Sequence, residues 1–305
     1  MTTHDPCSLP AQQLLNAQYL RELAGPQEFD ATALELHRAD TAAVESAWLA
    51  RELATVDTAT LPQRAEDFEP WYRARFREQV AAAEPFFDHL AQHASLEELS
   101  VYVLYEEQVD GRFDDVIAMA QMGLKGAAKV ALAANYWDEM GEGDATQMHT
   151  RLFCDSAEYF RNAIAGTQFG RFVQPTAEAL ANGNLLLLLS VRRQHCVRLM
   201  GALTLLEHTA PRRFSRAVQG MRRLGVPEDI IYYHEMHVKI DAKHGDDLLN
   251  QVVLPMLRER PELTAEVATG VQLRLQVANR YYAMLEDVFA SARETGASVA
   301  LEATA

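Results

Sequence analysis

The sequence predicts an all-α protein. Apolar residues recur with a period of about 3.6 along nearly the whole chain, which is the spacing of an amphipathic helix. No stretch shows the alternation of apolar and polar residues that is typical of a half-buried strand. Glycine and proline separate the periodic segments with short loops, which favours antiparallel helices packed as a bundle.

Two parts of the chain differ in the length of the expected helices. Residues 1–65 predict short helices, because Gly25-Pro26 and Leu61-Pro62 interrupt the pattern, and longer periodic segments begin at residue 66. The expected helices span 10–24, 28–37, 40–54, 66–82, 83–93, 95–122, 124–140, 147–165, 172–182, 184–208, 211–224, 227–257 and 261–294. We expect a helical extension over 1–85, a core domain over 86–295 and a frayed tail over 296–305.

Composition excludes several classes of protein. With 305 residues, of which 49% are hydrophobic, the chain can bury one large core plus an extension. Its net charge of −15 argues against nucleic acid or an anionic membrane as a partner. There is no apolar run of about 18 residues, and the first ten residues lack the segments of a secretory signal. The three cysteines form no CxxC pair, which fits a cytoplasmic protein without disulfides.

Two histidines and an aspartate share one face of an expected amphipathic helix. His237, Asp241 and His244 are spaced i, i+4 and i+7, within about 60° of arc. The same face carries Ile230 and Leu248, so three polar side chains point where apolar ones are expected. Burying them without partners is costly, and a metal ion is the partner that uses all three. Imidazole and carboxylate ligands suit iron, manganese or zinc.

Residues 135–149 contain two further candidate ligands. A helix is expected to end at Glu139, two glycines follow at Gly141 and Gly143, and His149 begins the next helix. Glycine allows backbone conformations closed to other residues, so Glu139 and His149 can face a common point. Taken alone, Glu139 could equally be a solvated acid at a helix end, and His149 an ordinary satisfied histidine. Together with the first motif, they are better explained as ligands.

Two more glutamates lie on apolar helix faces. Glu207 continues the apolar stripe of its helix, although exposure at a helix end before Pro211 would also explain it. In the helix expected over 95–122, Glu106 and Asp110 point inward. We take Glu106 as the ligand, with Glu107 as the alternative.

The number of candidates favours two metal ions. The seven expected ligands are Glu106, Glu139, His149, Glu207, His237, Asp241 and His244. One metal cannot bind all of them and keep an open position, whereas two metals about 3.5–4 Å apart can share them. Three imidazoles with several carboxylates suit a pair of irons. A ferritin-like site would need two Glu-x-x-His pairs, and no histidine of this chain follows a glutamate at that spacing.

In this order, the motifs resemble those of the haem-oxygenase-like diiron oxidases and oxygenases, which are iron-containing redox enzymes. The resemblance spans about 90–290 and rests on Asn-x-x-Asp-Glu-x-Gly-x-Gly ending at Gly143, and on the histidines and acids that follow it. It implies a single haem-oxygenase-like bundle that holds two irons, Fe²⁺ or Fe³⁺, and reacts with O₂. Carried over residue by residue, it places Glu106, His149, Glu207 and His244 at one iron, and Glu139, His237 and Asp241 at the other.

The resemblance also implies an O₂-dependent enzyme with an external electron donor. We favour N-oxygenation of an amine or amino-acid-derived metabolite in a biosynthetic pathway, because the segment around Glu139 resembles the N-oxygenating members. The alternative is desaturation or oxidative C–C cleavage of an amino or fatty acid. A metal-free thiaminase-like enzyme would need Cys154 or Cys196 as nucleophile, and a non-catalytic scaffold would use the histidines only in core hydrogen bonds. We expect a homodimer, with residues 1–85 as a dimerising or lid-forming extension.

Overall fold

The computed structural model describes the backbone of residues 5–303 and the side chains of 5–293 apart from residue 39. It contains no strand within the described residues, which confirms the all-α prediction. The α-helices are α1 (Leu9–Glu22), α2 (Ala31–Ala54), α3 (Ala65–Gln92), α4 (Leu96–Glu106), α5 (Phe113–Ala120), α6 (Gly126–Glu139), α7 (His149–Ile164), α8 (Ala177–Val191), α9 (Cys196–Arg223), α10 (Glu228–Asp247), α11 (Leu254–Glu259) and α12 (Thr264–Ala303). The shorter turns are η1 (Thr58–Thr60), η2 (Asp110–Arg112), η3 (Gly141–Gly143), η4 (Gln168–Val173), η5 (Arg193–His195), η6 (Leu248–Val253) and η7 (Pro261–Leu263).

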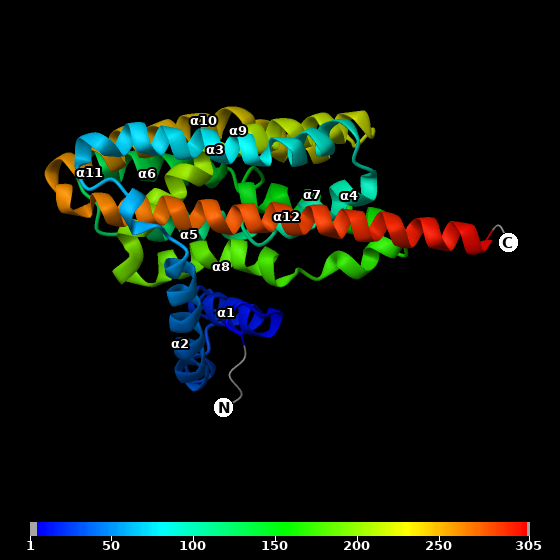
Figure 1. Cartoon of the computed structure of the whole chain (residues 1–305), viewed down its shortest axis with the longest axis horizontal. Helices are drawn as coiled ribbons and strands as arrows, with labels where there is room; N and C mark the ends of the chain where they lie inside the picture. The colour runs from blue at the N-terminus through cyan, green and yellow to red at the C-terminus, as the bar shows by residue number, and fades with distance from the viewer. Residues whose placement is uncertain (1–4, 304–305) are drawn as a thin grey trace.

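The long helices form one bundle around α9. This helix packs against α10, α12 and α3, and Figure 1 shows α3, α9 and α10 running together along one side of the molecule. α8 lies on the other side of α12, and nearly all of it is buried, including the leucine run 185–189. A helix that is apolar all round needs burial on every side, and α8 obtains it from α1, α9 and α12. No helix in the described part of the chain combines the length and apolar character needed to span a bilayer.

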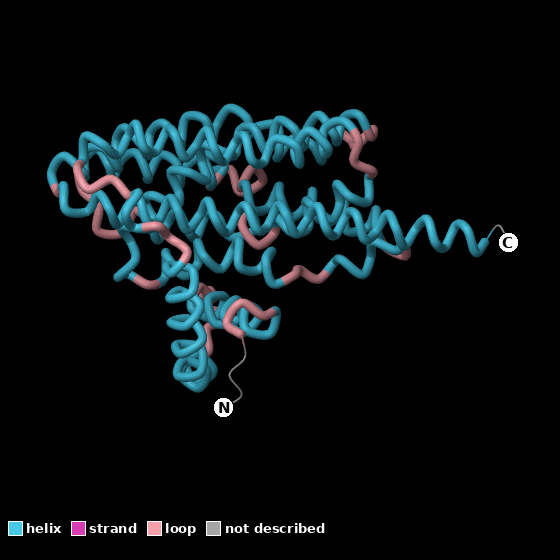
Figure 2. Tube along the Cα trace, in the orientation of Figure 1, coloured by secondary structure: helices cyan, strands magenta, loops and turns pink. Residues whose placement is uncertain are grey.

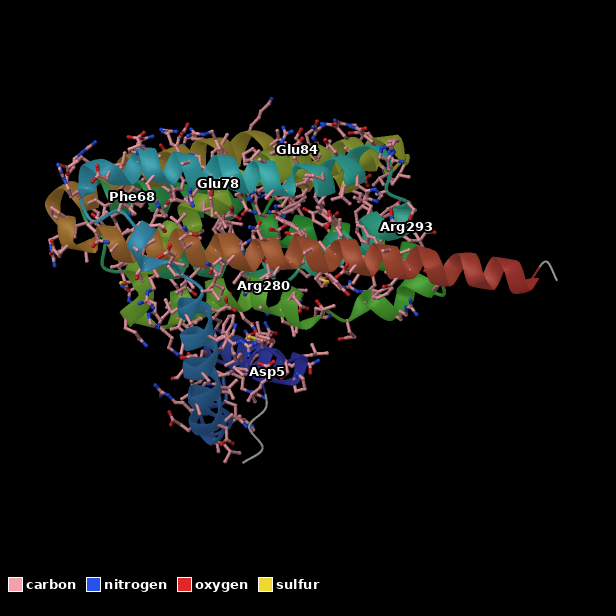
Figure 3. The ribbon with its side chains drawn as sticks, in the orientation of Figure 1. Asp5, Phe68, Glu78, Glu84, Arg280 and Arg293 are labelled. Carbon is pink, nitrogen blue, oxygen red and sulfur yellow. The ribbon has the colours of Figure 1, made fainter. Side chains whose placement is uncertain are left out.

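The N-terminal helices α1 and α2 form an arm beside the bundle, and residues 55–64, which include η1, join α2 to α3 (Figures 1 and 2). α1 packs on α8, and Glu52 of α2 forms an ion pair with Arg280 of α12, which Figure 3 labels near the junction. The expected extension over 1–85 also included most of α3, but α3 belongs to the bundle and runs without interruption past Pro85. Proline removes one backbone hydrogen bond from a helix, and packing of α3 against α9 and α12 outweighs that loss.

Other helix boundaries differ from the predicted ones for similar reasons. The helix expected over 95–122 is divided into α4, η2 and α5, whereas the break expected at Pro211 is absent from α9. The segment 227–257 is helical throughout but includes the π-helical turn η6. α12 continues to Ala303, so most of the tail expected to be frayed from residue 296 is helical.

Candidate metal centre

Four helices bring six of the seven expected ligands together in the interior of the bundle. They form two groups, and within each group one potential ligand atom per residue lies within 4.8 Å of the others. The first group is Glu139, His149 and His237, and the second is Glu207, Asp241 and His244. All six residues are buried.

This partition corrects the one implied by the resemblance. His149 lies with Glu139 and His237, not with Glu207. Asp241 lies with Glu207 on the other side. His237 and Asp241 are one helical turn apart on α10, a rise of about 6 Å, so the two groups are neighbours. The spacing of the α10 motif therefore sets the distance between the groups.

The turn between α6 and α7 brings Glu139 to His149. Gly141 and Gly143 have φ angles of 60° and 94°, in the left-handed region that favours glycine. A Cβ atom on Gly141 would lie 2.5 Å from the backbone carbonyl carbon of Gln147, so the turn also needs the absence of a side chain there. As a result, Oε2 of Glu139 lies 3.1 Å from Nδ1 of His149, across ten residues of sequence.

Two of the histidines are each oriented by a hydrogen bond from one ring nitrogen. His237 donates Nδ1–H to the carbonyl oxygen of Tyr233 at 2.6 Å, which leaves Nε2 free. His244 donates Nε2–H to Oδ2 of Asp138 at 2.8 Å, which leaves Nδ1 free. Metal-binding histidines usually have such a partner, because it fixes the ring and the tautomer.

Several polar atoms of the two groups are buried without a hydrogen-bond partner among the described residues. They are Nδ1 of His244, Oε1 of Glu139 and Nδ1 of His149, which lies close to Oε2 of Glu139 but outside hydrogen-bond geometry. In the second group, Asn135 donates to Oε1 of Glu207 at 2.8 Å, while Oε2 of Glu207 lies 3.8 Å from Nδ1 of His244. Unpaired buried polar groups are costly. A cation bound between them would satisfy these atoms, so the donor set fits divalent metal ions.

The interior also favours the uncharged forms of these side chains. Burial, aided by His149, holds the pKa of His237 well below its usual range, so the imidazole is neutral as a metal ligand must be. Burial raises the pKa of Glu207 to about 7, although His244 opposes the shift. Burial and the nearby carboxylates Glu207 and Glu139 raise the pKa of Asp241 well above its usual range. Ionised acids this close together need a cation between them.

Glu106, the seventh expected ligand, lies in neither group. It points inward as predicted, but its Oε1 accepts a hydrogen bond from Tyr281 at 2.8 Å and its Oε2 one from Arg213 at 2.5 Å. Arg213 also binds both carboxylate oxygens of Asp110, each at 3.1 Å. The alternative, Glu107, forms an ion pair with an arginine near the surface. Helical periodicity gave the direction of the Glu106 side chain but not its partners.

A small cavity of about 20 Å³ borders the two groups, with room for about one water molecule. Its wall includes Glu207, His237 and Asp241, and Asp110 and Arg213 face it from the adjacent ion-pair cluster. The rest of the lining is apolar and consists of Leu206, Ala210 and the aromatic rings of Phe113, Phe214 and Tyr233. Substrate-sized access would therefore require these side chains to move.

The cysteines lie away from this cavity. Cys154 is exposed and Cys196 is half-buried, and neither lines the cavity wall. Partial burial, followed by the nearby Glu107, raises the pKa of the Cys154 thiol, which disfavours the nucleophilic thiolate. The site thus offers nitrogen and oxygen ligands but no thiol.

Comparison with known proteins adds the family context. The sequence model of a family described as iron-containing redox enzymes matches residues 101–279. A crystal structure of a domain of unknown function with a haem-oxygenase-like fold, from Shewanella denitrificans OS217, superposes with a TM-score of 0.52. That domain is 14% identical and the match covers 73% of this chain and 92% of the domain, so it confirms the predicted fold. No curated protein sequence matches the chain.

Proposed function

The chain belongs to the iron-containing redox enzyme family, and from that membership we propose that it is an O₂-dependent oxygenase or oxidase with a two-iron centre. The observation that carries the proposal is the pair of adjacent buried groups, each with three nitrogen or oxygen ligands. Imidazoles and carboxylates in this number suit two irons better than zinc or magnesium. Six protein ligands shared by two ions leave open positions for O₂ and substrate.

Each ion has its own set of residues in this proposal. Glu139, His149 and His237 would hold one iron, and the group on the Glu207 side would hold the other. When bound, the pair supplies the electrons that reduce O₂ and the oxidising power that modifies the substrate. The protein contributes the geometry: Asp138 and the Tyr233 carbonyl keep two imidazoles in the tautomer that presents a free nitrogen.

The cavity wall supports a nitrogen-containing substrate. Asp110 is held by two hydrogen bonds from Arg213, and both oxygens keep a further lone pair available. A substrate ammonium or amine N–H can donate to Asp110 while Glu106 continues to neutralise Arg213. Aromatic rings around the cavity would shield the substrate from bulk water and place its nitrogen beside the two ligand groups. We therefore propose N-oxygenation of a small amine or amino-acid-derived metabolite.

The second candidate reaction uses the same metal centre on carbon. Phe113, Phe214 and Tyr233 give the cavity an apolar wall on which the alkyl chain of an amino or fatty acid could pack. In that case the product would be an alkene or a cleaved carbon chain. Asp110 would then have no substrate nitrogen to bind.

One experiment separates these possibilities. Metal-free protein is titrated anaerobically with Fe²⁺, and we expect two ions per chain. The loaded protein is then given O₂, a reductant and a panel of amines, amino acids and fatty acids, and products are identified by mass spectrometry. Addition of oxygen to a substrate nitrogen supports the proposed reaction, whereas loss of two hydrogens or of a carbon fragment supports the second. Uptake of one ion or none would overturn the two-iron centre.

A further inference from the structure

The outer face of α6 is exposed and carries no charge. Every residue from Gly126 to Trp137 that falls within about 120° of arc on this side is glycine, alanine, valine or tryptophan. They are Gly126, Ala127, Val130, Ala133, Ala134 and Trp137, all exposed. Val130 is 68% exposed and Trp137 54%. Large apolar side chains on one helix face are usual where that face meets another protein.

The opposite face of α6 is fixed by the metal centre. Asn135 binds Glu207, and Glu139 belongs to the first ligand group. Leu132 lies on the same side in the hydrophobic core. α6 packs mainly on α5, η3 and η6, so it cannot rotate to bury its outer face without dismantling the site. Burial of this face requires another molecule.

The residues that flank α6 carry opposite charges. Lys125 precedes the first turn of α6 and is exposed, and Glu142 follows the last turn and is also exposed. Within the described chain, neither side chain has an ion-pair partner. Glu142 is held in the left-handed backbone region by the turn after α6, with φ of 52°, so its position relative to the helix is defined. The helix is therefore preceded by a positive residue and followed by a negative one.

We propose that the α6 face, defined as the six exposed residues above with Lys125 and Glu142, is the interface with a second copy of this chain. Two copies related by a two-fold axis near Ala133 and Ala134 run antiparallel at α6, which places Lys125 of one copy opposite Glu142 of the other. The alanines permit close approach of the two backbones, and Val130 packs across the axis. A two-fold interface needs a self-complementary surface, and this charge arrangement provides it.

The charge of the whole molecule favours the same surface. Each copy has a net charge of −15, so two copies repel each other over most orientations. Contact through an uncharged helix face with two opposite-charge pairs at its ends avoids that repulsion. The arm offers a competing surface, since Leu36 of α2 is 72% exposed. Whether the arm contributes to dimer formation is tested separately with a substitution at Leu36.

The first test measures self-association of the full-length chain by sedimentation equilibrium. Wild type should form a dimer at micromolar concentration, and Val130→Glu should raise the dissociation constant at least about thirtyfold, because it buries a charge at the centre of the interface. Leu36→Glu adds the same charge to a side chain of similar exposure on the arm and should leave the constant unchanged. Iron uptake and circular dichroism establish that both variants are folded.

The second test exchanges the charges of Lys125 and Glu142. Recovery of the dimer in the double variant cannot result from unfolding. Lys125→Glu and Glu142→Lys should each weaken the dimer about tenfold, since each places like charges opposite one another twice. The double variant restores both pairs and should return the dissociation constant to within about threefold of wild type. A monomeric wild type at about 100 μM, a dimer unaffected by Val130→Glu, a dimer dissociated by Leu36→Glu or no rescue in the double variant would each overturn the proposal.

Discussion

Replacement of Asp138 by asparagine should weaken iron binding at one of the two groups. The Asp138 carboxylate orients His244 at 2.8 Å but is not itself in either group. Loss of such a partner typically weakens metal binding about 10- to 100-fold, or about 1.4 to 2.7 kcal/mol. Asp138 is 25% exposed whereas His244 is 1% exposed, so the change leaves no buried unpaired charge and the fold should be retained.

The measurement compares anaerobic Fe²⁺ binding with thermal unfolding. A 10- to 100-fold loss of affinity should remove the same 1.4 to 2.7 kcal/mol, about 2 to 4 °C in Tm for a chain of this length, from the stabilisation that Fe²⁺ provides. Glu235→Gln is the control, since it removes a charge from the exposed face of the same helix, α10, where Glu235 pairs with a surface arginine. Equal affinity and equal metal-linked stabilisation in wild type and Asp138→Asn would refute the role given to this carboxylate.

Three further predictions concern the ligands and the turn. Gly141→Ala should cost about 2–3 kcal/mol of unfolding free energy in urea, because its Cβ would meet the backbone of Gln147; a cost below about 0.5 kcal/mol would contradict the close contact. Asp241→Ala should lower anaerobic iron uptake below two ions per chain; unchanged uptake with reduced stability would instead favour a structural role for this residue. Glu106→Gln should lower stability by about 1–3 kcal/mol through its bond to Arg213 while iron uptake stays at two, and loss of one ion would reinstate Glu106 as a ligand.

The sequence predicted the parts of the site that local geometry determines. The i, i+4, i+7 spacing of His237, Asp241 and His244 defines one face of any α-helix, and α10 places all three inside. The two glycines after Glu139 predicted a turn that other residues could not form, and the φ angles bear this out. In both cases the constraint acts within about two turns of helix, so no knowledge of the tertiary fold was needed.

The sequence could not supply contacts between distant segments. Arg213 and Tyr281 reach Glu106 from 107 and 175 residues away, and nothing in the spacing of charged residues identifies them as its partners. An inward-facing carboxylate is equally consistent with a metal and with a buried guanidinium. The continuation of α9 through Pro211 also depends on contacts between distant segments. Local propensity predicts a helix end at this proline, but packing in the bundle keeps the helix continuous.

The two proposals meet in α6, which has residues of the proposed metal centre on one face and the proposed dimer contact on the other. In the proposed two-iron centre Glu139 would bind one iron, while Asn135 and Asp138 orient residues of the second group, so bound iron would hold the helix in a single position. A dimer contact through Val130 holds the same helix from outside. Thermodynamic linkage then requires the effects to be reciprocal: if iron strengthens the dimer, the dimer strengthens iron binding by the same factor. Two copies joined at α6 would thus hold rigid the helix that shapes both of their metal centres.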